Sequence, residues 1–185
     1  MIKRLKFVST LSVLAMSLFL WSCDNVGDTM QPELKPAKMV VMSTSGNTYT
    51  VAMENDPEVG TVTAVIGSSG GHLILGQHTL DVSANAVDQP TTFTMTRSAE
   101  NPLRVKLTAG RESENDVGSV GFAAPVSLTL SYVKAEDAPA DKSLITLFYF
   151  RPDGLVEEMT TNLRVSGADA TADLPHFSLF GLGWP

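Results

Sequence analysis

The sequence predicts an all-β fold, an antiparallel β-sandwich that follows a signal peptide and a short tether. From Met39 onward, short runs of alternating apolar and polar residues are separated by turns rich in glycine, proline, asparagine and aspartate. The clearest run covers residues 125–132, where Val126, Leu128 and Leu130 fall on one face and hydroxyl residues fall on the other. This period of two is typical of a half-buried strand, and many such strands without helical periodicity indicate a sandwich or a barrel.

Residues 1–22 have the pattern of a secretory signal peptide. Lys3, Arg4 and Lys6 supply the positive end, and residues 7–21 are apolar apart from four serine and threonine residues. This apolar run is shorter than the roughly 20 residues that a comfortable transmembrane helix needs. We therefore expect the segment to be removed during export.

Cys23 is the only cysteine of the chain and directly follows the apolar run. Leu20-Trp21-Ser22-Cys23 resembles the bacterial lipoprotein signal, in which the cysteine thiol receives a diacylglyceryl group and the peptide is cut just before it. The resemblance implies a cell-envelope lipoprotein that faces the periplasm and is held in the lipid bilayer by acylated Cys23, since two or more acyl chains anchor stably. The alternatives are an ordinary residue after an ordinary signal, or a buried free thiol.

Asp24 bears on which membrane holds the anchor. In enterobacterial lipoproteins an aspartate directly after the cysteine resembles a signal for retention at the inner membrane, so Asp24 favours the inner over the outer membrane. Residues 24–38 contain Pro32 and Pro36 and few apolar residues, which is typical of a flexible tether.

The exported chain is acidic. Loss of Lys3, Arg4 and Lys6 leaves ten basic residues against 20 acidic ones, a net charge of −10 with neutral histidines. This balance argues against a nucleic-acid partner, which requires clustered Lys and Arg. Residues 39–185, about 150 in number, fit one domain with its own core.

Several further runs predict strands and core residues. The expected strands are residues 48–53, 62–66, 79–83, 92–96, 103–108, 125–132, 144–150, 155–159, 162–165, 168–172 and 176–182. The expected core residues, besides those named above, are Leu80, Val82, Phe93, Met95, Leu103, Val105, Leu107 and Tyr132. Residues 144–150 are apolar on both faces, which predicts a central strand that ends at the turn Arg151-Pro152-Asp153-Gly154. Residues 135–142 are expected to form a long surface loop.

Three segments of the domain, in this order, resemble the ZU-five domain, a β-sandwich module of zonula occludens proteins and netrin receptors that also occurs in bacterial envelope proteins. The first is Gly70-Gly71-His72-Leu73 followed by residues 80–86. Within it, Ser83 stands where the family usually has proline, and Asn85 stands where it usually has glycine.

The second segment is Gly121-Phe122-Ala123-Ala124-Pro125 with the alternating strand that follows it, although the proline-any-glycine usually found just before is missing. The third is His176-Phe177-Ser178-Leu179-Phe180, which resembles the closing strand of the family. Together the three segments cover about residues 70–184. The resemblance implies a β-sandwich that serves as an interaction or structural module.

His176-Phe177-Ser178 also carries the most specific chemical hypothesis. Self-cleaving members of the family cut between Phe and Ser in such a motif. The Ser178 hydroxyl would attack the Phe177 carbonyl, His176 would take the proton, and water would hydrolyse the resulting ester. The favoured interpretation is structural: Phe177 packs in the core, while His176 and Ser178 hydrogen-bond on the other face of the last strand.

Other residue patterns give weaker hypotheses. His72 and His78 lack the close spacing of metal ligands and are expected to be surface or turn residues. Glu112, Glu114 and Asp116 alternate like the start of a calcium loop, but the glycine and the later bidentate glutamate are absent, so a solvated hairpin is favoured. We expect no metal and no cofactor.

The sequence thus favours a membrane-anchored lipoprotein with a protein-interaction or structural domain and an unidentified envelope protein as partner. No catalysis on an external substrate is expected. One alternative is the self-processing domain described above. Another is a carbohydrate- or peptide-binding sandwich that uses Trp184, Tyr149 or loop residues.

Overall fold

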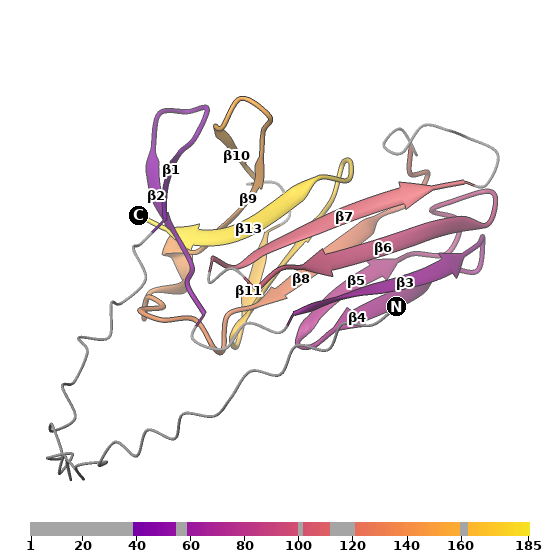
Figure 1. Cartoon of the computed structure of the whole chain (residues 1–185), viewed down its shortest axis with the longest axis horizontal. Coiled ribbons are helices and arrows are strands. Elements are labelled where there is room, and N and C mark those ends of the chain that lie inside the picture. Colours follow the sequence, from indigo (N-terminus) through magenta and orange to yellow (C-terminus); the bar gives the residue numbers. More distant parts are fainter. Residues whose placement is uncertain (1–38, 55–58, 100–101, 112–120, 160–162) are drawn as a thin grey trace, which may run out of the picture. The chain divides into compact units, whose positions relative to one another are not determined.

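The computed structural model describes residues 39–54, 59–99, 102–111, 121–159 and 163–185. Cys23, the tether 24–38 and the acidic residues Glu112, Glu114 and Asp116 lie outside these ranges. The described residues form thirteen strands in two antiparallel sheets and one short 3₁₀ helix, which confirms the all-β sandwich (Figure 1). Among them, no helix is both long and apolar enough to cross a membrane.

The larger sheet contains eight strands. Its main path runs in the order β1, β2, β13, β7, β6, β3. In addition, β9 pairs with β13, and β10 pairs with β9. The strands are β1 (Val40–Met42), β2 (Thr48–Val51), β3 (Gly60–Ile66), β6 (Thr91–Arg97), β7 (Arg104–Gly110), β9 (Thr146–Phe150), β10 (Val156–Glu158) and β13 (Leu179–Trp184).

The smaller sheet contains five strands in the order β11, β12, β8, β5, β4. They are β4 (Gly71–Leu75), β5 (His78–Val82), β8 (Val126–Ser131), β11 (Arg164–Ser166) and β12 (Asp169–Asp173). The two sheets face each other over the main core, to which β5, β6, β7 and β8 contribute every second residue. All eleven residues that the alternation assigned to the core are buried.

A second, smaller core lies on the other face of the large sheet. β1, β2, β13, β9 and β10 are paired in this order, and a parallel bridge between Ser43 and Val156 brings β10 back to the end of β1. The five strands therefore curl into a small barrel, which we call the side barrel. Its interior holds Val41, Tyr49, Val51, Phe148 and Val156, with Met39 and Phe150 packed against them.

β9 belongs to both cores, which explains its continuous apolar sequence. Leu147 faces the main core and Phe148 faces the interior of the side barrel, and both are fully buried. The prediction of a central strand is confirmed, because β9 pairs with β10 on one side and β13 on the other.

Most strand boundaries differ from the expectation by one or two residues, and β4 was missing from the expected strands. Three further differences have a clear physical reason. β1 was not predicted, since three residues are too few to show a period of two. Leu144 belongs to the 3₁₀ helix Lys142–Leu144, which the Asp141 carboxylate caps, so β9 begins two residues later than expected. β13 begins at Leu179 and not at His176, because residues 175–178 form the bend that carries the chain from the smaller sheet to the larger one.

Candidate functional site

The structure brings the three segments that resemble the ZU-five domain together at one end of the sandwich. Gly70 has a φ of 75°, and a Cβ there would lie 2.6 Å from the Val82 carbonyl oxygen and 2.8 Å from the Ala84 backbone nitrogen. Only glycine fits such a position without strain. The two halves of the first segment therefore touch, backbone against backbone.

Asn85 occupies the position where the family usually has glycine. Its φ is 62°, in the left-handed region that glycine adopts freely and asparagine tolerates better than most residues. Its backbone nitrogen donates to the Ser68 carbonyl at 2.8 Å. Asn85 departs from the family pattern, but its backbone has the conformation that a glycine would readily adopt there.

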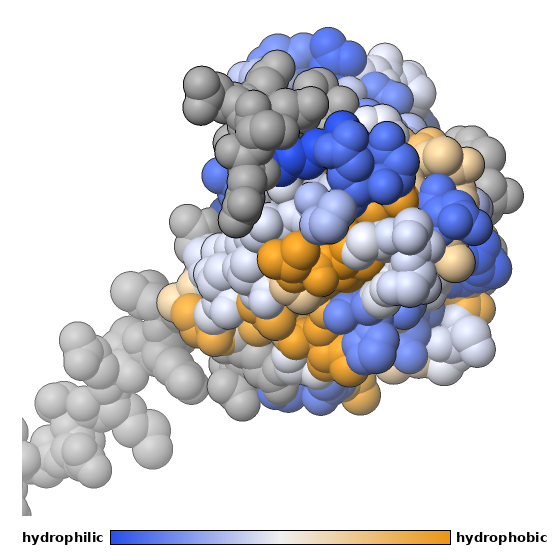
Figure 2. Space-filling view, turned by 90° about the vertical axis from the view of Figure 1, so that its right-hand side faces the viewer, coloured by the Kyte–Doolittle hydropathy of each residue, from blue (hydrophilic) through white to orange (hydrophobic). Residues whose placement is uncertain are grey.

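The second and third segments join the same end. The Ser83 nitrogen donates to the Pro125 carbonyl at 3.2 Å, and the Ala123 nitrogen donates to the Ala86 carbonyl at 3.0 Å. The Phe177 ring lies 4.9 Å from that of Phe122, measured between centroids. Figure 2 shows the molecule from the side on which β3 turns towards β4, and apolar side chains gather on this surface.

Phe177 holds the third segment to the core. It is half-buried, packs against the main core, and meets the fully buried Phe93 edge-on at 5.6 Å as well as Phe122. This confirms that Phe177 packs on the core. Ser178 contributes through its backbone, since its carbonyl accepts a 2.9 Å hydrogen bond from the Leu107 nitrogen.

His176 makes ring contacts, not the hydrogen bonds that we expected. Its imidazole meets the Tyr149 ring edge-on at 4.7 Å and stacks on Phe180 at 6.3 Å. Within the described part of the chain, no hydrogen bond joins the His176 imidazole to the Ser178 hydroxyl, and residues 176–178 have no positive φ and no cis peptide bond. Self-cleavage would require His176 to take the proton of the Ser178 hydroxyl and a strained bond between Phe177 and Ser178, so it stays an alternative to the structural interpretation.

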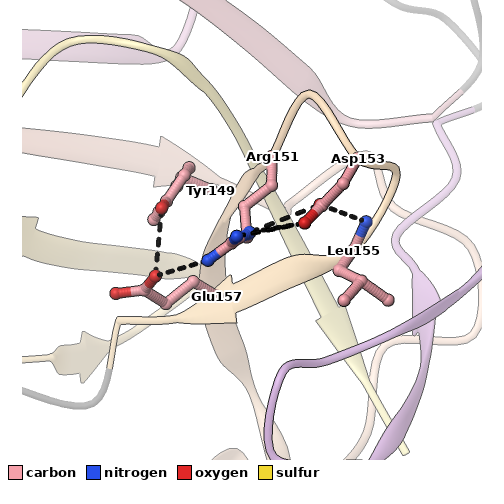
Figure 3. Close-up of polar contacts among 5 residues, drawn as sticks. All are labelled: Tyr149, Arg151, Asp153, Leu155 and Glu157. Atoms are coloured by element: carbon pink, nitrogen blue, oxygen red, sulfur yellow. Dashed lines mark hydrogen bonds and ion pairs between the residues drawn. The ribbon is translucent and has the colours of Figure 1, made fainter.

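Tyr149 connects His176 to a charged cluster on the β9–β10 hairpin (Figure 3). The Tyr149 hydroxyl donates to the Glu157 carboxylate at 3.0 Å, and Arg151 forms an ion pair with Asp153 at 3.0 Å and a longer one with Glu157 at 3.9 Å. Desolvation and the hydrogen bond to Glu157 raise the pKa of Tyr149.

The turn of this hairpin is held by Asp153. The Arg151 side chain and the Leu155 backbone nitrogen both donate to its carboxylate, and these hydrogen bonds lower the pKa of Asp153. Every polar group of the cluster thus already has a partner within the cluster. The arrangement stabilises the hairpin and forms an aromatic and acidic surface. Its charged groups already pair with one another, so none of them needs a ligand as a partner.

The two histidines outside the third segment lie in different surroundings. His72 is exposed, as expected, whereas His78 is only 3 % exposed. The Nδ1 atom of His78 accepts a hydrogen bond from the Ser131 backbone nitrogen at 3.2 Å. Among the described residues, no three metal-ligating side chains come together.

His78 borders a cavity of about 10 Å³, which is close to the space that one water molecule needs. The other residues around this cavity are Glu54, Gln77, Ser131 and Lys134. Glu54 also forms a buried ion pair with Arg97 at 2.5 Å, and Arg97 donates to the Pro102 carbonyl at 3.0 Å. Sequence reasoning missed this pair, because 43 residues separate its members and no local pattern marks either one.

Trp184 does not form an exposed aromatic platform. It is 7 % exposed and belongs to the main core, whereas Tyr149 is half-buried. The ligand-binding alternative therefore loses one of its two named aromatic residues and keeps Tyr149. Comparison with known proteins gives no further guidance: no protein-family model matches the chain, and no curated protein matches it.

Proposed function

We propose that this protein is a membrane-anchored lipoprotein of the bacterial cell envelope, whose ZU-five-like sandwich is an interaction or structural module without catalysis on an external substrate. The support for the anchor is the position of Cys23, which directly follows the apolar run of the signal peptide. Acylation there would leave residues 24–38 as the link between the bilayer and β1.

One observation carries the structural interpretation of the domain: Phe177 packs between Phe93 and Phe122 and so ties the closing segment to the second one. The convergence of the three segments at one end and the left-handed Asn85 support the resemblance to the ZU-five family. With Phe177 on the core and His176 against Tyr149, the His-Phe-Ser motif acts as a closure of the fold.

The test is the intact mass, under denaturing conditions, of the protein extracted from its native membrane. The expected mass is that of residues 23–185 plus acyl groups on Cys23. A Cys23→Ser variant should remain unprocessed and lack the acyl mass, whereas Ser178→Ala should not change the mass beyond the substitution itself. A lipidated chain that ends at Phe177, and becomes full-length in Ser178→Ala, would contradict the proposal and favour self-processing.

A further inference from the structure

One edge of the large sheet is left open for pairing. β3 hydrogen-bonds to β6 over all seven of its residues, and within the described residues no strand pairs with its other side. Natural sheets protect such edges with charged residues, proline, bulges or short strands, because the free N–H and C=O groups readily pair with another chain. The β3 sequence GTVTAVI has none of these protections.

The main core is also incomplete at this edge. Val62 and Ala64 of β3 point into the sandwich and are only half-buried. Their partners on β6, Met95 and Phe93, are fully buried. A strand added beside β3 would therefore cover apolar side chains as well as satisfy the backbone.

The surroundings of the edge are apolar too. Val65 and Val59 are 68 % and 60 % exposed, and Ile74 on the neighbouring β4 is 56 % exposed. These three are among the most exposed large apolar side chains of the described residues. Their removal from water would favour an interface here.

We propose that this edge pairs with the same edge of a second copy, β3 antiparallel to β3, across a two-fold axis. An isologous contact places a surface against itself, so the surface must complement itself. An antiparallel strand pair meets this requirement, because each strand supplies the donors and acceptors that the other needs. On the outer face, Thr61 and Thr63 already pair with Thr96 and Thr94 of β6, and the second copy would extend this threonine array.

The charge distribution permits two copies to meet at this edge. The exported chain has a net charge of −10, so two copies repel each other over most approaches. β3 carries no charge, and the one charged residue of β6, Arg97, is buried and paired with Glu54. Two copies can meet here without opposing like charges. The inference deepens the interaction-module part of the proposed function and rests on it.

The first test is sedimentation of the full chain, purified from its membrane in detergent, over a range of concentrations. The wild-type chain should show a concentration-dependent dimer. Val65→Lys places a charge on the proposed interface and should weaken the dimer about tenfold or more, because the ammonium groups lose water or face apolar partners. Val40→Lys is the matched control: Val40 is 59 % exposed on β1, at the opposite end of the same sheet from β3, and its substitution should leave the dimer unchanged.

The second test is a single-cysteine scan of residues 61–65, which reports the contact even if Val65→Lys proves unstable. In an antiparallel pair related by a two-fold axis, one residue faces its own copy, with a Cα separation that a disulfide can span. Cross-linking on oxidation should therefore peak at one position and decline on both sides. The chain without an added cysteine and the Val40→Cys variant should remain monomeric in denaturing gels.

A monomer at all concentrations, with no cross-link above that of Val40→Cys, would overturn the inference. So would an edge that captures a strand from a different protein while the purified chain stays monomeric. Failure of the proposed function is distinguishable, because it appears as a cut or unacylated chain in the mass measurement. An intact, acylated chain that does not dimerise would contradict this inference alone.

Discussion

The main core and the side barrel share β9 and β13 but are built in different ways. In the main core, large apolar residues from two facing sheets interdigitate, and each strand contributes alternate positions over its whole length. The interior of the side barrel has few large residues, and these pack against the small residues Gly181 and Gly183 of β13, which form the floor of the barrel. The first arrangement follows from local alternation, and the second depends on a long-range closure.

The floor of the side barrel consists of Gly181 and Gly183. A Cβ at Gly181 would lie 2.7 Å from the Phe150 ring, and one at Gly183 would meet the Thr50 carbonyl and lie 3.0 Å from the Phe148 ring. The two phenylalanines therefore pack on bare backbone. Since a few contacts carry the whole barrel, we expect it to be more sensitive to a single substitution than the sandwich is.

The largest effect should come from Phe148→Ala, which removes the centre of the side barrel. Phe148 is fully buried and touches Tyr49 and Phe150 at centroid distances of 5.8 and 5.6 Å. Truncation of a buried phenylalanine costs about 3–5 kcal/mol of the free energy of unfolding. Hydrogen exchange should show lost protection in β1 and β2 and retained protection in β8. The matched variant Phe93→Ala should lower protection in the sandwich strands, and identical exchange patterns would show that the two cores are one unit.

A smaller effect should follow Gly183→Ala. The added methyl group collides with the Thr50 carbonyl, which belongs to the paired strand β2 and cannot move freely. Overpacking of this kind costs about 1–3 kcal/mol, measurable as a shift of the denaturant midpoint. Gly110→Ala is the control, since no atom lies within 4 Å of the added Cβ, and its stability should not fall. Equal midpoints for the two variants would mean that the barrel adjusts to the extra volume.

The contrast between the two regions also explains how much the sequence could predict. Leu128 and Phe93 were assigned to the core from their own strands, because the period of two is a local property. The closure between Ser43 and Val156 joins residues far apart in the chain, and no local pattern announces it. The same holds for His176, whose contact with Tyr149 depends on the bend before β13.

Acid should weaken the side barrel through Glu158 at its rim. The Ser45 hydroxyl donates to the Glu158 carboxylate at 2.6 Å, and this hydrogen bond lowers the pKa of Glu158 from the ordinary value of 4.5. A lowered pKa in the folded state means that the ionised group stabilises the fold above pH 4.5, and that this contribution is lost as the pH falls through the lowered pKa.

Glu158→Gln should therefore be less stable than wild type at neutral pH by about 1 kcal/mol or less, because the hydrogen bond is solvent-exposed. The two stabilities should converge in acid, as measured by denaturant titrations at several pH values. Asp81→Asn, an exposed carboxylate on β5 of the sandwich, provides the comparison. A constant difference between Glu158→Gln and wild type at all pH values would show that ionisation of Glu158 does not contribute.

The smallest effect should come from hydroxyl groups on the outer face of the sandwich. Thr94 and Thr63 are hydrogen-bonded through their side chains at 3.1 Å in an exposed position, where water offers an equivalent partner. Thr94→Val keeps the β-branched shape that suits a strand, so the free energy of unfolding should change by less than about 0.5 kcal/mol. Ser45→Ala at the rim of the side barrel removes one hydroxyl as well, but that hydroxyl donates to a carboxylate, and its loss should cost more. If Thr94→Val proved the more damaging of the two, the threonine face would contribute to the monomer fold itself, and the side barrel would not be the more sensitive region.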